Sequence, residues 1–393
     1  MNILLVLFII LEVFVVVHLL FPVYLWISQF LGSKKYEENL ANVEGDYAII
    51  VTAYQQITLI PDVVKSLLAL NYGNYIVYVV ADNCDVSSLN FNDDRVVVLR
   101  PENILASNVK SHFYAIANFK RAHNRLTIID SDNIVDKDYL LELDKVFDLG
   151  YNAVQGVRAA KNLNTTYACL DAANDIYYRY VDKYLLTKAG SSSSLSGSGM
   201  AFTTSLYIDC LQNIDSNGAG FDKVLQYEII VRKHKIAFVP SAIVYDEKTS
   251  KSDQLVKQRA RWINTWFKFF KLGLKMLLRG IAKFNYNQFL FGIMLCRPPL
   301  FILLFLTAFC FVINLFVSLT MATLFALFAV LFVLIFIKSL SYFKADRKIY
   351  QSLVGIPKFI FFQIKALSKA RVANKISVAT EHYVEKTANL NNN

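Results

Sequence analysis

The sequence predicts an α/β domain, with a mostly parallel sheet and helices on both faces, that is joined to transmembrane and interfacial helices. Three observations support this prediction. Apolar strand patterns alternate with helical patterns from Gly45 onward, several predicted strands end in acids or amides, and long apolar segments flank the alternating region. This alternation gives a parallel sheet covered on both faces, because each helix crosses over the sheet to reach the next strand.

The alternating region contains five short apolar runs that we predict to be strands. They cover residues 47–52, 75–81, 95–99, 126–129 and 152–158. The clearest helical patterns between them cover residues 110–122 and 136–147, the second with acids in its first turn.

Two carboxylates follow the apolar run at residues 126–129. Asp130 and Asp132 are two residues apart in an extended chain, so their side chains point to the same face. Ligands bind at the carboxyl edge of such a sheet, and oxygen ligands there suit Mg²⁺ or Mn²⁺ bridging to a substrate diphosphate. The structural alternative is a simple turn, because Asp, Ser and Asn all favour turns. The two acids alone do not decide between these interpretations.

The apolar segments at both ends predict a membrane protein. Hydrophobic residues make up 55% of the 393 residues, and the runs at 3–20 and 299–337 are long enough for one span and two spans. A signal peptide is the alternative at the N-terminus, but a basic start and a small-residue cleavage site are missing there. Lys34 and Lys35 follow the first run, which predicts a cytoplasmic location for the next domain.

The net charge of +10 lies mainly beside these apolar runs. This favours anionic lipid headgroups over nucleic acid as the partner of the basic residues. The basic, aromatic segment 262–284 is suited to the membrane interface, although an ordinary surface helix is the alternative. The five cysteines have neither metal-site nor disulfide spacing, which is typical of a reducing compartment.

These features divide the chain into five predicted regions. They are an N-terminal transmembrane anchor (1–31), a cytoplasmic domain (39–260), an amphipathic interface helix (261–285), a transmembrane hairpin (286–340) and a cytoplasmic C-terminal segment with an amphipathic helix and a polar tail (341–393). Within the cytoplasmic domain, the run of serines and glycines at 191–199 has the composition of a flexible linker. It is either a low-complexity loop or a loop that covers a bound substrate.

Four motifs stand in order along the chain. They are Asp130-Ser131-Asp132, Gly197-Ser198-Gly199-Met200-Ala201-Phe202, Gly220-Phe221-Asp222-Lys223 and Gln258-Arg259-Ala260-Arg261-Trp262. Together, in a chain with membrane segments, they resemble the membrane-embedded members of glycosyltransferase family 2, which include cellulose, hyaluronan and poly-N-acetylglucosamine synthases. The resemblance covers residues 45–270. It implies a GT-A-type fold and a catalytic role for the cytoplasmic domain.

The resemblance also implies a site for a nucleotide sugar. Gln56 departs from the family pattern, because it replaces an acid in the first nucleotide-binding loop. The implied donor-binding residues are Ala53, Tyr54, Gln56, Asp82, Lys110, Asp130, Gln258 and Arg261, and the implied ligand of Mg²⁺ or Mn²⁺ is Asp132.

Asp222 falls where the family has its catalytic base. Phe221 replaces the glutamate that usually precedes the base, and Glu228 is a rival base in the same segment. The implied acceptor-binding residues are Gly199, Met200 and Trp262. An aromatic ring such as that of Trp262 gives an acceptor sugar an apolar face on which to stack.

The expected activity is inverting transfer of a sugar from a nucleotide diphosphate, with a UDP sugar as the first candidate. The acceptor would be a glycan or a lipid-linked molecule at the cell membrane, the product would be β-linked, and a protein partner for export is conceivable. A nucleotidyltransferase is a weaker alternative, because residues 52–57 have no glycine for a phosphate loop. An inactive homologue that acts as a membrane partner subunit is the alternative outside the enzymes.

Overall fold

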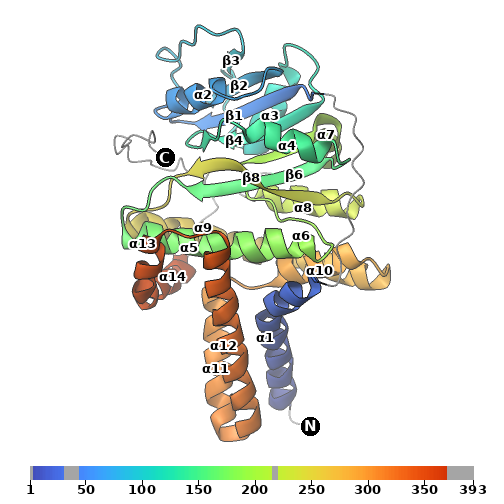
Figure 1. Cartoon of the computed structure of the whole chain (residues 1–393), viewed down its shortest axis with the longest axis vertical. Helices are drawn as coiled ribbons and strands as arrows, with labels where there is room; N and C mark the ends of the chain where they lie inside the picture. Colours follow the sequence, from blue (N-terminus) through green and yellow to red (C-terminus); the bar gives the residue numbers. More distant parts are fainter. Residues whose placement is uncertain (1–2, 31–43, 215–219, 370–393) are drawn as a thin grey trace.

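The computed structural model describes residues 3–30, 44–214 and 220–369. The molecule has three tiers (Figure 1): the sheet domain, a tier of helices that lie across its base, and helices that project away from it. The N-terminal end of the projecting helix α1 points away from the sheet.

The described part of the chain forms one eight-stranded sheet in the order β3-β2-β1-β4-β7-β6-β8-β5. Its strands are β1 (Tyr47–Tyr54), β2 (Tyr75–Asp82), β3 (Val96–Leu99), β4 (Arg125–Asp130), β5 (Ile134–Val135), β6 (Ala153–Ala160), β7 (Met200–Thr203) and β8 (Ile236–Asp246). Strands β1 to β4 are parallel, as are β6 and β8, whereas β7 is antiparallel to both of its neighbours and β5 is antiparallel to β8. The predicted fold class is confirmed, with a mixed sheet whose parallel half contains the first four strands.

Helices cover both faces of this sheet. The described helices are α1 (Ile3–Ser28), α2 (Ile60–Leu68), α3 (Asn108–Ala117), α4 (Tyr139–Phe147), α5 (Thr166–Arg179), the π-helix η1 (Tyr180–Leu185), α6 (Leu186–Lys188), α7 (Thr204–Leu211), α8 (Phe221–Val231), α9 (Ser252–Ala282), α10 (Tyr286–Cys296), α11 (Leu300–Val317), α12 (Leu319–Tyr342), α13 (Arg347–Ser352), the 3₁₀-helix η2 (Leu353–Gly355) and α14 (Ile356–Lys369).

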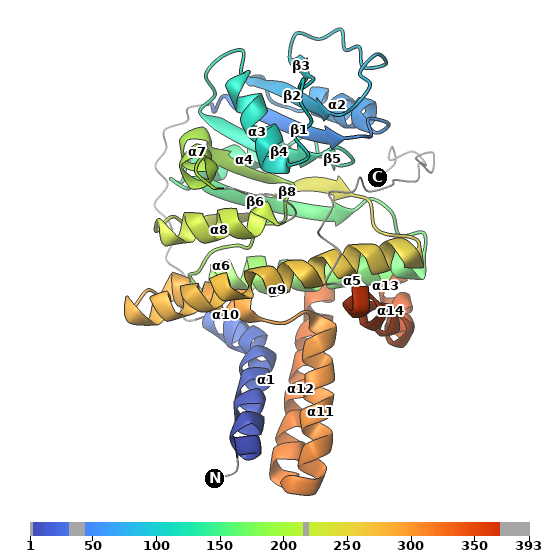
Figure 2. The same cartoon turned by 180° about the vertical axis from the view of Figure 1, so that it is seen from behind.

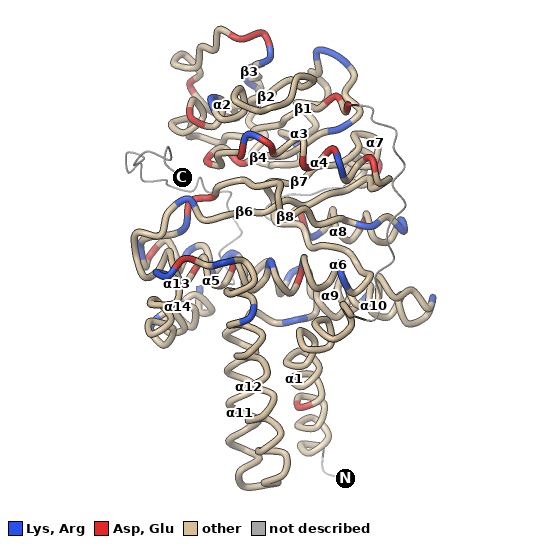
Figure 3. Tube along the Cα trace, viewed as in Figure 1, with Lys and Arg blue, Asp and Glu red and all other residues tan. Residues whose placement is uncertain are grey.

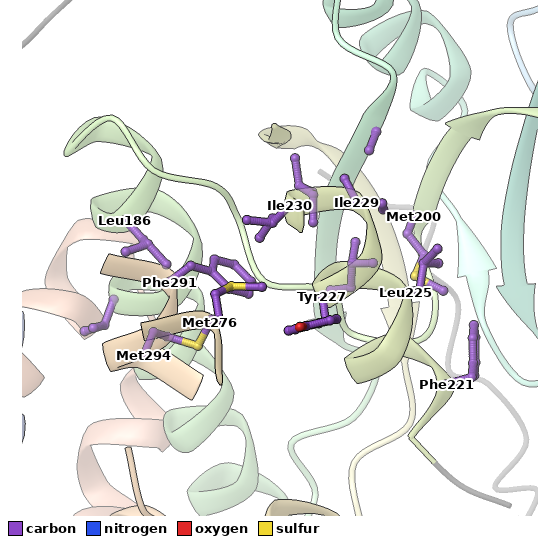
Figure 4. Packing of buried hydrophobic residues seen from close by; sticks show 14 of the residues in the cluster. Leu186, Met200, Phe221, Leu225, Tyr227, Ile229, Ile230, Met276, Phe291 and Met294 are labelled. Carbon is purple, nitrogen blue, oxygen red and sulfur yellow. The ribbon is translucent and has the colours of Figure 1, made fainter. Parts of the chain in front are cut away.

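Alternate residues of β1 enter two separate cores, because successive side chains of a strand point to opposite faces. Ile49 and Val51 pack with α2 and α4. Ala48 and Ile50 belong to a larger core that includes α3, α7 and α8 and continues into the helices below the sheet. Figure 4 shows part of this larger core, with the α8 side chains on the β7 side and α9 and α10 side chains packed together.

Two helices are shorter than the sequence pattern predicts. The helix predicted at 110–122 ends at Ala117, because the residues after it bond to the sheet: the Lys120 N–H donates to Tyr78 Oη. The helix predicted at 136–147 begins at Tyr139. Asp136 instead accepts a hydrogen bond from the Asp138 N–H, a local turn that competes with helix formation.

The tier below the sheet contains the predicted interface helix. Helix α9 is one continuous helix of 31 residues that crosses the base of the sheet domain (Figure 2), so the boundary predicted between residues 260 and 261 falls inside it. Its exposed side carries both large apolar residues, such as Phe267 and Leu278, and lysines. Helix α14 packs beside it and corresponds to the second amphipathic piece predicted near the C-terminus.

Among the described residues, α1, α11 and α12 are long and apolar enough to cross a membrane. Figure 3 shows these helices as nearly free of charged residues. Glu12 of α1 is an exception, and it is buried against α11, where Asn314 Nδ2 donates to its carboxylate. A polar pair of this kind lowers the cost of a carboxyl group among apolar helices.

The approach of β6 to β8 and to the 191–199 segment depends on Gly156. A Cβ atom at this position would lie 2.4 Å from the Ala242 carbonyl oxygen and 3.2 Å from that of Gly199. We therefore expect Gly156→Ala to destabilise the protein by about 1–3 kcal/mol, as overpacking does. Gly73→Ala is the control, since its nearest atom would be a Glu44 side-chain oxygen at 3.8 Å. Equal melting temperatures for the two purified variants would contradict this account.

Candidate active site

Strand pairing brings three predicted donor-binding residues to one edge of the sheet. In the parallel register, Tyr54 of β1 is opposite Asp82 of β2, and Thr52 of β1 is opposite Asp130 of β4. Ala53 is buried beside Tyr54, whereas Gln56 is exposed just beyond the strand. The carboxyl edge of the parallel half is thus lined by residues that the sequence singled out, at the place where open α/β sheets bind ligands.

Asp82 is the centre of a set of tight turns at this edge. Its two carboxylate oxygens accept hydrogen bonds from the backbone N–H groups of Leu105 (3.0 Å) and Ala106 (2.7 Å). Three residues around it, Gln55, Asn83 and Ala106, have φ angles of 61°, 52° and 46°. Left-handed backbone outside glycine is uncommon, and strained backbone of this kind clusters at functional sites.

Lys110 lies in the first turn of α3, just after the turn that Asp82 holds. Its backbone N–H donates to Ser107, the N-cap residue of the helix, and its side chain is exposed. Lys110 can therefore reach a ligand at this edge without losing a buried partner.

Asp130 and Asp132 lie where β4 ends. The Asp130 N–H donates to Ser198 Oγ at 3.0 Å, which fixes the end of the strand against the 191–199 segment. Asp132 is only 9% exposed, and its Oδ1 accepts a hydrogen bond from Asn133 Nδ2 at 3.1 Å. The two acids therefore belong to an ordered polar edge and are held by specific partners.

The 191–199 segment is not a flexible linker. Its serines at 191–194 and 198 are buried, and its polar groups are bonded on both sides. The Ser191 and Ser192 hydroxyls donate to Asn287, the Leu195 N–H donates to Gln226, and the Ser196 N–H donates to Gln155. Small polar residues are present because they let the backbone pack closely while satisfying buried groups. The linker interpretation was wrong, and Gly199 and Met200 follow as part of the packed sheet.

Asp222 lies in the first turn of α8, after Gly220, which has a φ of 96°. Its carboxylate pairs with Lys223 at 3.0 Å, and Lys223 Nζ also donates to the Leu195 carbonyl oxygen at 3.3 Å. Asp222 is thus tied to the same 191–199 segment that Ser198 links to Asp130. Leu195 and Ser198 are three residues apart, which limits the distance between their Cα atoms to about 10 Å.

A buried lysine faces the same region. Lys183 of the π-helix η1 donates to the backbone oxygen of Ser194 at 2.6 Å and to its hydroxyl at 3.2 Å. Burial, with Lys223 adding to it, lowers the pKa of Lys183 to about 7. Sequence reasoning missed this residue, because one lysine in a helix carries no signal of burial.

A network of buried ion pairs lies beside the acids, and sequence reasoning missed it as well. Asp246 at the end of β8 pairs with Arg158 at 2.8 Å and with Lys248 at 2.9 Å. Lys248 also pairs with Asp175 of α5. Burial alone would raise the pKa of the Asp246 carboxyl, but its two cationic partners hold that pKa well below its usual range.

The Gln-x-x-Arg-Trp motif lies near the start of α9 and contributes to the same network. Arg259 is buried in an ion pair with Asp171 of α5, and its guanidinium lies 4.3 Å from the ring centroid of Trp262. Trp262 is 42% exposed. Gln258 Oε1 accepts a hydrogen bond from Thr249, and burial lowers the pKa of the partly buried Arg261. Arg259, which the sequence did not single out, is therefore the structural arginine of the motif.

The surroundings of Asp132 suit a divalent cation that is coordinated partly by the protein and partly by the substrate. Within the described ranges, no group of three or more His, Cys, Asp or Glu side chains is arranged to hold a metal ion. Mg²⁺ and similar ions typically take one or two carboxylates and complete their shell with water and substrate phosphates. An ordered carboxylate at a ligand-binding edge fits that pattern.

Comparison with known proteins places this geometry in one family. The model of glycosyltransferase-like family 2 matches residues 45–265, more than half of the chain. The protein is thus a glycosyltransferase built on a GT-A-type sheet, and it belongs to glycosyltransferase family 2. The match does not separate the cellulose, hyaluronan and poly-N-acetylglucosamine synthases from other members, so that finer prediction stays untested.

One solved structure supports the fold. Mannosyltransferase PcManGT from Pyrobaculum calidifontis, solved in complex with GDP-Man and Mn²⁺, is 14% identical with a TM-score of 0.57. The match covers 92% of this chain and 99% of that one, so it extends beyond the sheet domain to the flanking helices. TarS from S. aureus is 13% identical, with a TM-score of 0.38 over 63% of this chain and 55% of its own. No curated protein sequence matches.

Proposed function

We propose that this chain is an inverting, metal-dependent glycosyltransferase of the cell membrane. It would transfer a sugar from a nucleotide diphosphate to a glycan or lipid-linked acceptor at the cytoplasmic face, giving a β-linked product from an α-linked donor. The observation that carries the proposal is that the 191–199 segment contacts both the Asp130–Asp132 end of β4 and the Asp222 end of α8.

In this proposal the polar edge of the sheet binds the donor. The nucleotide lies along the ends of β1 and β2, near Ala53, Tyr54, Gln56, Asp82 and Lys110. A divalent cation on Asp132 would neutralise charge on the departing diphosphate. Asp130 holds the nucleotide sugar. Lys110 and Arg261 supply further positive charge, and the planar guanidinium of Arg261 suits an oxyanion.

Asp222 acts as the catalytic base. An acceptor hydroxyl is a poor nucleophile, so a carboxylate within hydrogen-bond reach must take its proton as the hydroxyl attacks the anomeric carbon. One base and direct displacement invert the anomeric centre. Trp262 would offer its exposed ring face to the acceptor sugar. Gly199 and Met200 are the other residues assigned to the acceptor side, although the Met200 side chain is fully buried in the sheet.

A donor screen tests the proposal. Purified full-length protein is heated with UDP sugars and GDP sugars, each with and without Mn²⁺. GDP-mannose is included because PcManGT was solved with it. A ligand at 100 times its Kd stabilises the folded state by about 2.7 kcal/mol, so the donor should raise the melting temperature only when Mn²⁺ is present. The shift should disappear in Asp132→Ala. Absence of any shift, together with absence of donor hydrolysis, would contradict the proposal.

The membrane setting gives a separate prediction. Lys268, Lys271 and Lys275 are exposed on α9 beside exposed apolar residues. We expect reversal of all three to glutamate to weaken docking of the sheet domain on vesicles that contain anionic lipid, because each basic residue near such a surface contributes about 1 kcal/mol. Lys65→Glu on α2, at the other end of the molecule (Figure 1), is the control.

Protection of α9 from hydrogen exchange in such vesicles, compared with vesicles of neutral lipid, measures this docking. Equal protection of the triple variant and the unmodified protein would show that α9 is an ordinary surface helix.

A further inference from the structure

Asn133 follows the two acids directly and is completely buried. Its amide is bonded on three sides. Ser198 Oγ donates to Asn133 Oδ1 at 2.6 Å, and Asn133 Nδ2 donates to Asp132 Oδ1 at 3.1 Å and, over a longer distance of 3.4 Å, to Asp246 Oδ1. We propose that Asn133 is a positioning residue that fixes the carboxylate of Asp132 for a divalent cation. The inference rests on the proposed function, which takes Asp132 as the metal ligand.

The first anchor of Asn133 is Ser198. The Ser198 hydroxyl accepts the Asp130 N–H at 3.0 Å and uses its own hydrogen to bond Asn133, so both of its bonds have a defined direction. Ser198 is itself completely buried in the packed 191–199 segment. This segment therefore holds the backbone of Asp130 directly, and it holds the side chain of Asp132 through Asn133.

The second anchor is Asp246. Its ion pairs with Arg158 and Lys248 hold its carboxylate in place and supply its counter-charge. Two cations already occupy Asp246, so it is poorly suited to ligate a metal, but it is well suited as a fixed acceptor for an amide. Lys248 also pairs with Asp175 of α5, so Asp246 is connected through Lys248 to the tier of helices below the sheet.

An asparagine is the side chain that this position requires. Its NH₂ group offers one N–H to each carboxylate, and its oxygen accepts from Ser198. Alanine would leave buried oxygens of Asp132 and Asp246 without this donor and the Ser198 hydroxyl without its acceptor. Partners that orient metal ligands typically contribute 10- to 100-fold to metal affinity or activity, although they do not touch the metal.

The test is Mn²⁺ binding to the full chain in detergent, measured from the loss of the electron paramagnetic resonance signal of free Mn²⁺. Each titration is made with GDP and, separately, with UDP. We expect Asn133→Ala and the milder Ser198→Ala to weaken Mn²⁺ binding about 10-fold or more. Ser198→Ala decides the question if Asn133→Ala does not fold.

Asn71→Ala is the control. Asn71 Nδ2 also donates to a carboxylate, that of Asp138, at 2.7 Å, but it is not one of the residues that hold Asp132 or its anchors. It should bind Mn²⁺ like the unmodified protein. Unchanged Mn²⁺ binding in Asn133→Ala and Ser198→Ala, with loss in Asp132→Ala, would overturn this inference alone. Unchanged binding in Asp132→Ala would instead remove the metal site of the proposed function, and the inference with it.

Discussion

Replacement of Asp222 by asparagine should lower the rate of sugar transfer by about 10²- to 10⁴-fold, the usual contribution of a positioned general base. Asparagine keeps the size and much of the hydrogen bonding of aspartate, so the start of α8 and the contact of Lys223 with Leu195 should persist. Donor binding, measured as the Mn²⁺-dependent shift in melting temperature, should therefore remain while transfer is lost.

Glu228→Gln is the matched control for this variant. Glu228 lies further along α8, where its carboxylate pairs with Arg232, the C-cap residue of the helix. The same acid-to-amide change there should leave the transfer rate close to that of the unmodified protein. A fast Asp222→Asn enzyme, or a slow Glu228→Gln enzyme that still binds donor, would reverse the assignment of the base.

Loss of the buried ion pair between Arg259 and Asp171 should have the largest effect on stability. Both side chains are almost fully buried, and the pair joins α9 to α5. Removal of one partner from a buried pair costs about 3–5 kcal/mol, because the other charge stays buried without compensation. Asp171→Asn should therefore lower the melting temperature of the purified protein by about 10 °C.

Two further variants separate the loss of the pair from the loss of a single charge. Asp171→Leu combined with Arg259→Met should recover much of the stability, since apolar replacement of a whole buried pair is often neutral. Asp93→Asn breaks the more exposed pair with Arg95 and should change the melting temperature little. A double variant less stable than Asp171→Asn alone would indicate that packing, more than charge pairing, holds α9 to α5.

Much of the fold follows from local pattern. The run at 126–129 is apolar at every position except Thr127, and it is flanked by polar residues, so a buried central strand ending on Asp130 could be predicted from the sequence. The long apolar runs at 3–20 and 299–337 likewise predict the three membrane-length helices α1, α11 and α12. Residues 200–202 also have a strand-like pattern, but the antiparallel pairing of β7 and the pairing of β6 with β8 could not be predicted, because regular strand–helix alternation stops after residue 160.

The residues of the site that could not be predicted from the sequence are the buried polar ones, because composition does not show which polar residues are buried. The serines at 191–194 resemble a flexible linker in sequence, yet in the fold they bond to Asn287 and neighbouring groups and are buried. The sequence does not show which of the two arginines Arg259 and Arg261 is structural. Arg259 pairs with Asp171 because of its position on the helix in the folded protein. Asn133 looks like an ordinary turn residue until Ser198 and Asp246, distant in sequence, are brought beside it.

An experimental structure of the full chain with Mn²⁺ and the donor found in the screen tests the central claim most directly. The anomalous signal of manganese should lie on the Asp132 carboxylate and on the diphosphate of the donor. The anomeric carbon should face Asp222 across a space that one acceptor hydroxyl can enter. Manganese bound away from Asp132, or Asp222 separated from the donor sugar by the packed 191–199 segment, would contradict the account.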